Sequence, residues 1–138
     1  AAESAKFTMA YTRVGLTPDG SSTYFLPRIV GMKRALELTI TNRILSAQEA
    51  AEWGLVNRVV PDAELLVEAE KLAGELATGP TGAFGGAKRL LHSGWTETLE
   101  TQMENETQSI AARSKTEDGR EGITAFLEKR RPQFKGGR

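Results

Sequence analysis

The sequence predicts a mostly helical chain with one or two short strands. Stretches in which apolar residues recur every three or four positions account for most of its length, as is typical of helices packed on one face. Strand-forming composition is confined to residues 6–9 and 55–60. Because two strands this short cannot make a stable sheet alone, we expect their pairing partners to lie outside this chain.

The first helix is expected to begin near Ser22, directly after a turn rich in small and polar residues. Asp19 or Ser21 can cap its first amide groups, since both residue types are favoured at helix N-termini. Pro27 is expected to kink or end this helix, because proline lacks the amide hydrogen that continues it.

The remaining helices follow from apolar spacing and from stop signals. Ser46 and Glu49 form a capping-box pattern that starts a short helix, and Gly54 can adopt the left-handed conformation that ends it. The other expected helices are 32–41, 62–77, the stretch between Pro80 and Gly94, 96–114, and 118–129.

Composition excludes several functional classes. Lys plus Arg and Asp plus Glu each number 18, so no net charge draws the chain to nucleic acid or to an anionic membrane. The chain has no cysteine and one histidine, which excludes disulfides and a cysteine- or histidine-based metal centre, and we expect no metal. No membrane span or targeting signal is present, so the expected compartment is cytoplasmic. The first residue is Ala1, and we expect an amino-terminal half to be missing.

Asp19 is the strongest candidate for chemistry. It stands between Pro18 and the flexible segment Gly20-Ser21-Ser22, a setting that can hold a carboxylate rigidly at the mouth of a pocket. From spacing alone, the simpler alternative is an acid that caps the next helix or closes a local turn. The two roles are compatible with each other.

An ordered series of short motifs surrounds this acid. The series is Ala5-Lys6-Phe7, Leu26-Pro27-Arg28-Ile29-Val30-Gly31, Ser46-Ala47-Gln48-Glu49-Ala50 and Trp53-Gly54-Leu55-Val56. It resembles the C-terminal half of the enoyl-CoA hydratase/isomerase (crotonase) superfamily, over residues 2 to about 134. The resemblance implies the α/β crotonase-like fold (ClpP/crotonase fold), present here as a C-terminal fragment. Residues 1–60 would belong to the core with its active-site loop, and residues 61–138 to a helical region for CoA docking and trimerisation.

The resemblance also implies a substrate class and a mechanism. Members of the superfamily bind acyl-CoA thioesters and need no cofactor beyond the coenzyme A that the substrate carries. Two backbone amides stabilise the thioester enolate, and in the family both come from the half that this chain lacks. Members assemble as trimers or hexamers, and neither nucleic acid nor a membrane is an expected partner.

One position departs from the hydratase pattern. The second hydratase glutamate would fall at Tyr11, and tyrosine is a poor base near neutral pH because its reference pKa is about 10. Tyr11 is therefore expected to line the pocket, with proton transfer as the alternative. Asp19, eight residues later, replaces the usual glycine, as it does in the phenylacetyl-CoA ring isomerases and dienoyl-CoA isomerases, which use the acid for proton transfer. The 4-chlorobenzoyl-CoA dehalogenases use an aspartate in the same turn as a nucleophile.

These comparisons set the expected function. The chain is interpreted as part of an enzyme that isomerises or hydrates an enoyl-CoA through an enolate, with Asp19 as acid and base, and the isolated fragment is expected to be inactive. The alternatives are a non-catalytic oligomerisation and CoA-docking module, or a dehalogenase-type hydrolase with Asp19 as nucleophile. The expected substrate-binding residues are Tyr11, Thr23, Phe126 and Lys129, the last two by resemblance to the family's final helix, where they meet the adenine and a phosphate of CoA.

Overall fold

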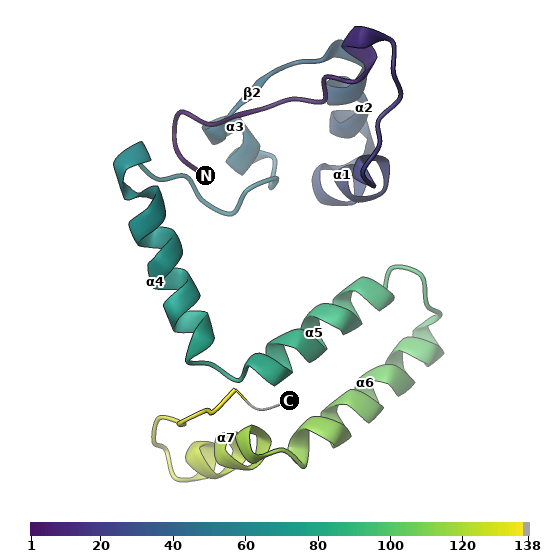
Figure 1. Cartoon of the computed structure of the whole chain (residues 1–138). Coiled ribbons are helices and arrows are strands. Elements are labelled where there is room, and N and C mark those ends of the chain that lie inside the picture. The colour runs from purple at the N-terminus through teal and green to yellow at the C-terminus, as the bar shows by residue number, and fades with distance from the viewer. Residues whose placement is uncertain (137–138) are drawn as a thin grey trace. The chain divides into compact units, whose positions relative to one another are not determined.

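The computed structural model describes residues 1–136 (Figure 1). The chain divides into two compact units, 1–68 and 69–138, which are described separately. The expectation of a mostly helical chain with one or two short strands is confirmed. The elements of the first unit are β1 (Lys6–Phe7), the 3-10 helix η1 (Thr12–Val14), α1 (Ser22–Val30), α2 (Met32–Thr41), β2 (Leu45–Ser46), α3 (Ala47–Glu52) and the 3-10 helix η2 (Asp62–Glu64).

The two strands form a small antiparallel ladder. Lys6 faces Ser46 and Phe7 faces Leu45, whose side chain is fully buried. The strand expected at 55–60 is wrong among the described residues. Leu55 and Val56 donate their amides to the carbonyl of Ala50 and so close the end of α3, and only Val60 makes a bridge, to Ala2. The backbone donors that a strand would have used are committed to the helix terminus.

Helices α1 and α2 pack against each other and supply much of the first unit's core. Its buried apolar residues are Val30, Ala35, Leu38, Leu45, Ala47 and Ala50. Helix α2 has the bounds expected from the sequence, but α1 continues through Pro27 to Val30 and ends at Gly31. Proline removes one hydrogen bond without forbidding helical backbone angles, so here the stop is made by Gly31, whose φ is 84°.

Helix α3 begins with the expected capping box. The Ser46 hydroxyl accepts from the amide of Glu49, and the Glu49 carboxylate accepts from the amide of Ser46 at 2.9 Å. The bonds that the Glu49 carboxylate accepts from the amide and the hydroxyl of Ser46, followed by the ion pair with Arg43, lower the pKa of Glu49. The cap therefore ties the end of α2, through Arg43, to the start of α3.

The second unit is built from helices. It contains most of α4 (Leu65–Ala77), then α5 (Thr81–Ser93), α6 (Leu99–Ser114) and α7 (Glu117–Leu127). Helices α5 and α6 lie side by side (Figure 1), joined where Gln102 donates to the carbonyl of Leu90 at 2.9 Å. Thr98 and Thr116 cap α6 and α7. Within residues 1–136, no helix combines the length and the apolar character needed to cross a membrane.

Candidate functional site

The fold brings two of the sequence-predicted site residues into contact. The hydroxyl of Tyr11 donates a hydrogen bond of 2.6 Å to Oδ1 of Asp19. This bond, together with the negative charge of Asp19, raises the pKa of Tyr11 above its ordinary value of 10.0. The phenol is therefore a neutral hydrogen-bond donor at physiological pH. Tyr11 is not among the residues that line the apolar pocket described below, and its expected role in lining a pocket stays a prediction.

Tyr11 is held by the turn that follows β1. Its carbonyl accepts from the amides of Val14 and Leu16, at 3.1 and 3.0 Å, which closes the η1 turn. Asn42, at the end of α2, is hydrogen-bonded to this turn. Its Oδ1 accepts from the Arg13 amide at 3.0 Å, and its Nδ2 donates to the Thr12 hydroxyl at 2.9 Å. The residue after Tyr11 is thus anchored to a helix some thirty positions away in sequence.

Asp19 is held by the first turn of α1. Its carbonyl accepts both the amide and the hydroxyl of Ser22, at 3.1 and 2.7 Å. The expectation that Asp19 or Ser21 caps α1 through its side chain is wrong. Ser21 occupies the N-cap position with φ of 64°, in the left-handed region, and its side chain makes no capping bond. Side-chain capping normally uses an extended N-cap residue, so this geometry leaves the Asp19 carboxylate available to Tyr11.

An apolar pocket opens on the same turn of α1. It has a volume of about 150 Å³ and lies between α1, α2 and Met9, which lies two residues beyond the end of β1. Its lining residues are Met9, Ser22, Thr23, Leu26, Pro27, Met32, Ala35, Leu36 and Thr39. Thr23, an expected substrate-binding residue, therefore lines this pocket. The residue before it, Ser22, also lines the pocket and donates to the backbone carbonyl of Asp19.

The expected CoA-contacting residues lie at the end of α7. Phe126 is 82% exposed and Lys129 is exposed. Lys129 has φ of 54°, a left-handed conformation that is uncommon for lysine. Its amide donates to the carbonyl of Phe126 and the Arg130 amide donates to that of Ala125, which together make a Schellman end to the helix. Their predicted contacts with CoA stay predictions.

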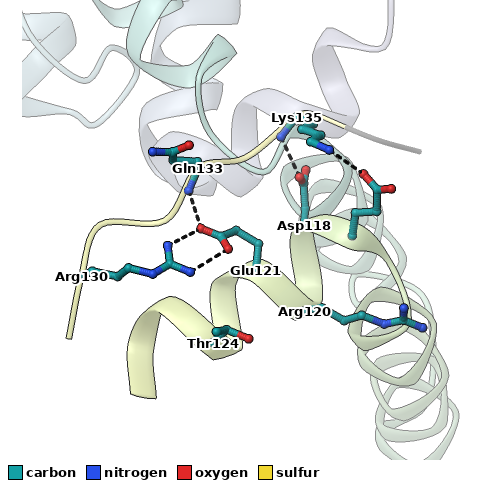
Figure 2. Close-up of a pocket in the computed structure, with 8 residues that line it drawn as sticks. Asp118, Arg120, Glu121, Thr124, Arg130, Gln133 and Lys135 are labelled. Atoms are coloured by element: carbon teal, nitrogen blue, oxygen red, sulfur yellow. Dashed lines mark hydrogen bonds and ion pairs between the residues drawn. The ribbon is translucent and has the colours of Figure 1, made fainter. Parts of the chain in front are cut away.

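The segment after α7 is fastened back onto that helix. The two carboxylate oxygens of Glu121 accept hydrogen bonds of 2.6 and 2.9 Å from the Arg130 guanidinium, and one of them accepts the Gln133 amide at 2.8 Å (Figure 2). These bonds lower the pKa of Glu121 to about 2. The buried Asp118 carboxylate accepts the amides of Lys135 and Gly136. The polar pocket of about 740 Å³ drawn in Figure 2 is lined by this cluster, and neither Phe126 nor Lys129 is among its lining residues.

Sequence reasoning missed the residues that position the others. The sequence alone points to no role in the site for Asn42, Thr12 or Asp118. A weak signal was present for Asn42, because asparagine tolerates the left-handed conformation that it adopts here, with φ of 53°. Its partners at Thr12 and Arg13 could not be found from local spacing.

Comparison with known proteins decides the family. The model of the enoyl-CoA hydratase/isomerase family matches residues 1–137. The chain belongs to this family. A 1,2-epoxyphenylacetyl-CoA isomerase of Escherichia coli (strain K12) is 47% identical over 138 residues, which are 99% of this chain and 52% of the relative. A 4-chlorobenzoyl coenzyme A dehalogenase of Arthrobacter sp. is 44% identical over 108 residues, 78% of this chain and 39% of the relative.

Solved structures agree with this assignment. An enoyl-CoA hydratase from Bacillus anthracis matches with a TM-score of 0.88 and 39% identity, over 99% of this chain and 53% of that one. The expected crotonase fold, and the expected resemblance to ring isomerases and to dehalogenases, are confirmed. The chain spans about half the length of the curated relatives it matches.

Proposed function

We propose that this chain is the C-terminal half of an acyl-CoA enzyme that moves a proton on an enoyl-CoA thioester, with Asp19 as the acid and base. The observation that carries the proposal is the exposed Asp19 carboxylate, whose Oδ1 is held by Tyr11 while its backbone is held by α1. A carboxylate fixed in this way, three residues before a helix that lines an apolar pocket, suits proton transfer at a bound acyl group.

The chemistry of such a step needs one acid. Asp19 would take a proton from a carbon near the thioester, and the electron pair would move to the thioester oxygen as an enolate. Return of the proton to a different carbon would complete a double-bond shift. Isomerisation suits this chain better than hydration, because hydration in the family uses a pair of glutamates and Tyr11 stands at one of those positions. Hydration stays within the proposal as the second reaction of the same family.

The acyl group would enter the apolar pocket beside Thr23. By resemblance to the family's final helix, Phe126 and Lys129 would contact the CoA portion of a substrate. The pocket volume of about 150 Å³ is comparable with cavities that accept a benzene-sized group. The E. coli relative is named for a phenylacetyl-CoA derivative, which supports an aromatic or short acyl chain. No resident cofactor is proposed, and the cytoplasmic location stays a prediction.

Assembly with copies of itself is part of the proposal. Large apolar side chains are exposed on α4, α6 and α7, among them Leu66 at 72%, Leu99 at 71% and Phe126 at 82%. Such surface is expected to be covered in the assembled protein, and a homotrimer or hexamer would do so. A non-catalytic assembly and CoA-docking role would use the same surface.

Isotope exchange tests the proposal. The full-length enzyme, incubated with an aryl enoyl-CoA in deuterated water, is expected to exchange carbon-bound hydrogen, and Asp19→Asn is expected to abolish the exchange. Exchange that survives in the variant would refute Asp19 as the base. The control is Asp62→Asn, which alters an aspartate that binds Ser4 instead.

The dehalogenase relative supports one second candidate, in which Asp19 attacks the substrate as a nucleophile. The carboxylate would form a bond to the ring carbon that carries the halogen, the carbon–halogen bond would break, and halide would leave. Water would then hydrolyse the resulting aspartyl ester at its carboxyl carbon, which releases the hydroxylated product and regenerates the Asp19 carboxylate. A single turnover of a 4-halobenzoyl-CoA in ¹⁸O-water would then place ¹⁸O in Asp19, whereas the acid–base mechanism leaves Asp19 unlabelled. Mass spectrometry of the peptide that contains Asp19 distinguishes the two.

A further inference from the structure

Tyr11 stands where a hydratase would carry a catalytic glutamate, and its hydroxyl is directed to Asp19. Its one phenolic proton is donated to Oδ1 of Asp19, over 2.6 Å. Within the described residues, Oδ2 of Asp19 accepts no hydrogen bond, and Asp19 is exposed. The two oxygens of the carboxylate are therefore distinguished by their surroundings.

We infer that Tyr11 is a positioning residue, which fixes the Asp19 carboxylate and directs the exchangeable proton to Oδ2. This inference rests on the proposed function of Asp19. A phenol that donates to Oδ1 can keep that bond in both protonation states, because Oδ1 of a protonated acid remains a carbonyl acceptor. Asp19 can then gain and lose a proton on Oδ2 without leaving its rotamer, which preserves the geometry of the transfer.

The backbone around the pair supports a positioning role. On the Tyr11 side, the η1 turn is fastened to the end of α2 by Asn42, through the Arg13 amide and the Thr12 hydroxyl. On the Asp19 side, Ser22 holds the carbonyl with both its amide and its hydroxyl. The short donor–acceptor distance is thus set by two separately anchored segments, and the segment 12–18 between them closes into a loop across the bond.

The contact with Asp19 also shifts the pKa of Tyr11. The raised pKa of Tyr11 has the hydrogen bond to Asp19 as its largest cause and the charge of Asp19 as its second. A hydrogen bond to a carboxylate is stronger than one between neutral groups, so the pair holds its geometry best when Asp19 is ready to act as a base.

The first test observes the pair directly, without turnover. The Tyr11 phenol is titrated by NMR in the chain labelled with ¹³C at tyrosine Cζ, where Tyr24 supplies the second signal in the same sample. Asp19→Asn is expected to lower the pKa of Tyr11 toward its ordinary value of 10.0, because the charged acceptor is lost. Glu52→Gln, on an exposed residue of α3, is the matched control and should leave the titration unchanged. An unaltered Tyr11 titration in Asp19→Asn would overturn the inference.

The second test measures catalysis in the full-length enzyme. Tyr11→Phe keeps the ring and removes the donor, and it is expected to lower kcat by about tenfold or more while changing KM less. Near-normal kcat in Tyr11→Phe, with Asp19→Asn inactive, would overturn the positioning role and leave the proposed function standing. Near-normal kcat in Asp19→Asn would refute the proposed function and the positioning role with it, and the titration would then describe a purely structural pair.

Discussion

Gly119 offers the sharpest test of how α7 is seated. A Cβ atom added at this residue would lie 2.1 Å from the carbonyl oxygen of Arg113 and 3.0 Å from its carbon. Both atoms are backbone at the end of α6, and the same carbonyl is engaged by the amide and the hydroxyl of Thr116. Relief of the contact needs a shift of about 1 Å in a turn that is hydrogen-bonded on both sides, so Gly119→Ala is expected to cost about 3 kcal/mol, at the upper end of overpacking.

Thermal unfolding followed by circular dichroism measures this cost. A loss of about 3 kcal/mol corresponds to a fall in Tm of about 10 °C or more for a chain of this size. The matched control is Gly74→Ala in α4, where nothing lies within 4 Å of the added atom. Alanine is the better helix former, so that variant should gain about 0.5–1 kcal/mol. A Gly119→Ala protein as stable as the parent would refute the packing described between α6 and α7.

Three further predictions concern the chain itself. The isolated 138-residue chain is expected to lack turnover, because the amides that stabilise the enolate in the family come from the other half; turnover of about 1 per second or more with an enoyl-CoA would contradict this. The isolated chain is also expected to self-associate, because large apolar side chains are exposed on it, and a clean monomer by light scattering would contradict this. The Glu121 carboxylate has a pKa of about 2 in the folded chain against an ordinary 4.5, so its stabilisation is present above pH 4.5 and is lost as pH falls toward 2. The Tm of Glu121→Gln should thus lie below that of the parent at pH 7 and converge with it near pH 2. The control is Glu117→Gln, on an 80% exposed carboxylate, which should change the Tm little. A difference in Tm between Glu121→Gln and the parent that persists at pH 2 would count against the ion pair.

Local signals in the sequence predicted most of the helices. The bounds of α2, the capping box at Ser46 and the left-handed stop at Gly54 agree with the structure, because each depends on residues within one helical turn of each other. The strand at 55–60 was wrong because its composition favours a strand while its amides are taken by the end of α3. The expectation that Pro27 kinks or ends the first helix did not anticipate that α1 continues to Val30, where Gly31 ends it.

The candidate site was also predicted only in part from the sequence. Asp19 was selected by its local turn and by family resemblance, both of which are visible in the sequence. Its hydrogen bond to Tyr11 depends on how the seven intervening residues fold, and the anchoring of that segment depends on Asn42, thirty residues from Thr12. Pairwise geometry of this kind is fixed by tertiary structure, which periodicity and propensity do not encode.

Replacement of Asp19 by asparagine tests the central claim most directly. Asn keeps the shape of the side chain and an oxygen that can accept the Tyr11 hydrogen bond, but it cannot exchange a proton in the same way. If Asp19 is the acid and base, turnover of an enoyl-CoA by the full-length enzyme is expected to fall by about a hundredfold or more. The Tm should change little, since the carboxylate makes no capping bond to α1. Turnover within about twofold of the parent enzyme, at an unchanged Tm, would contradict the account.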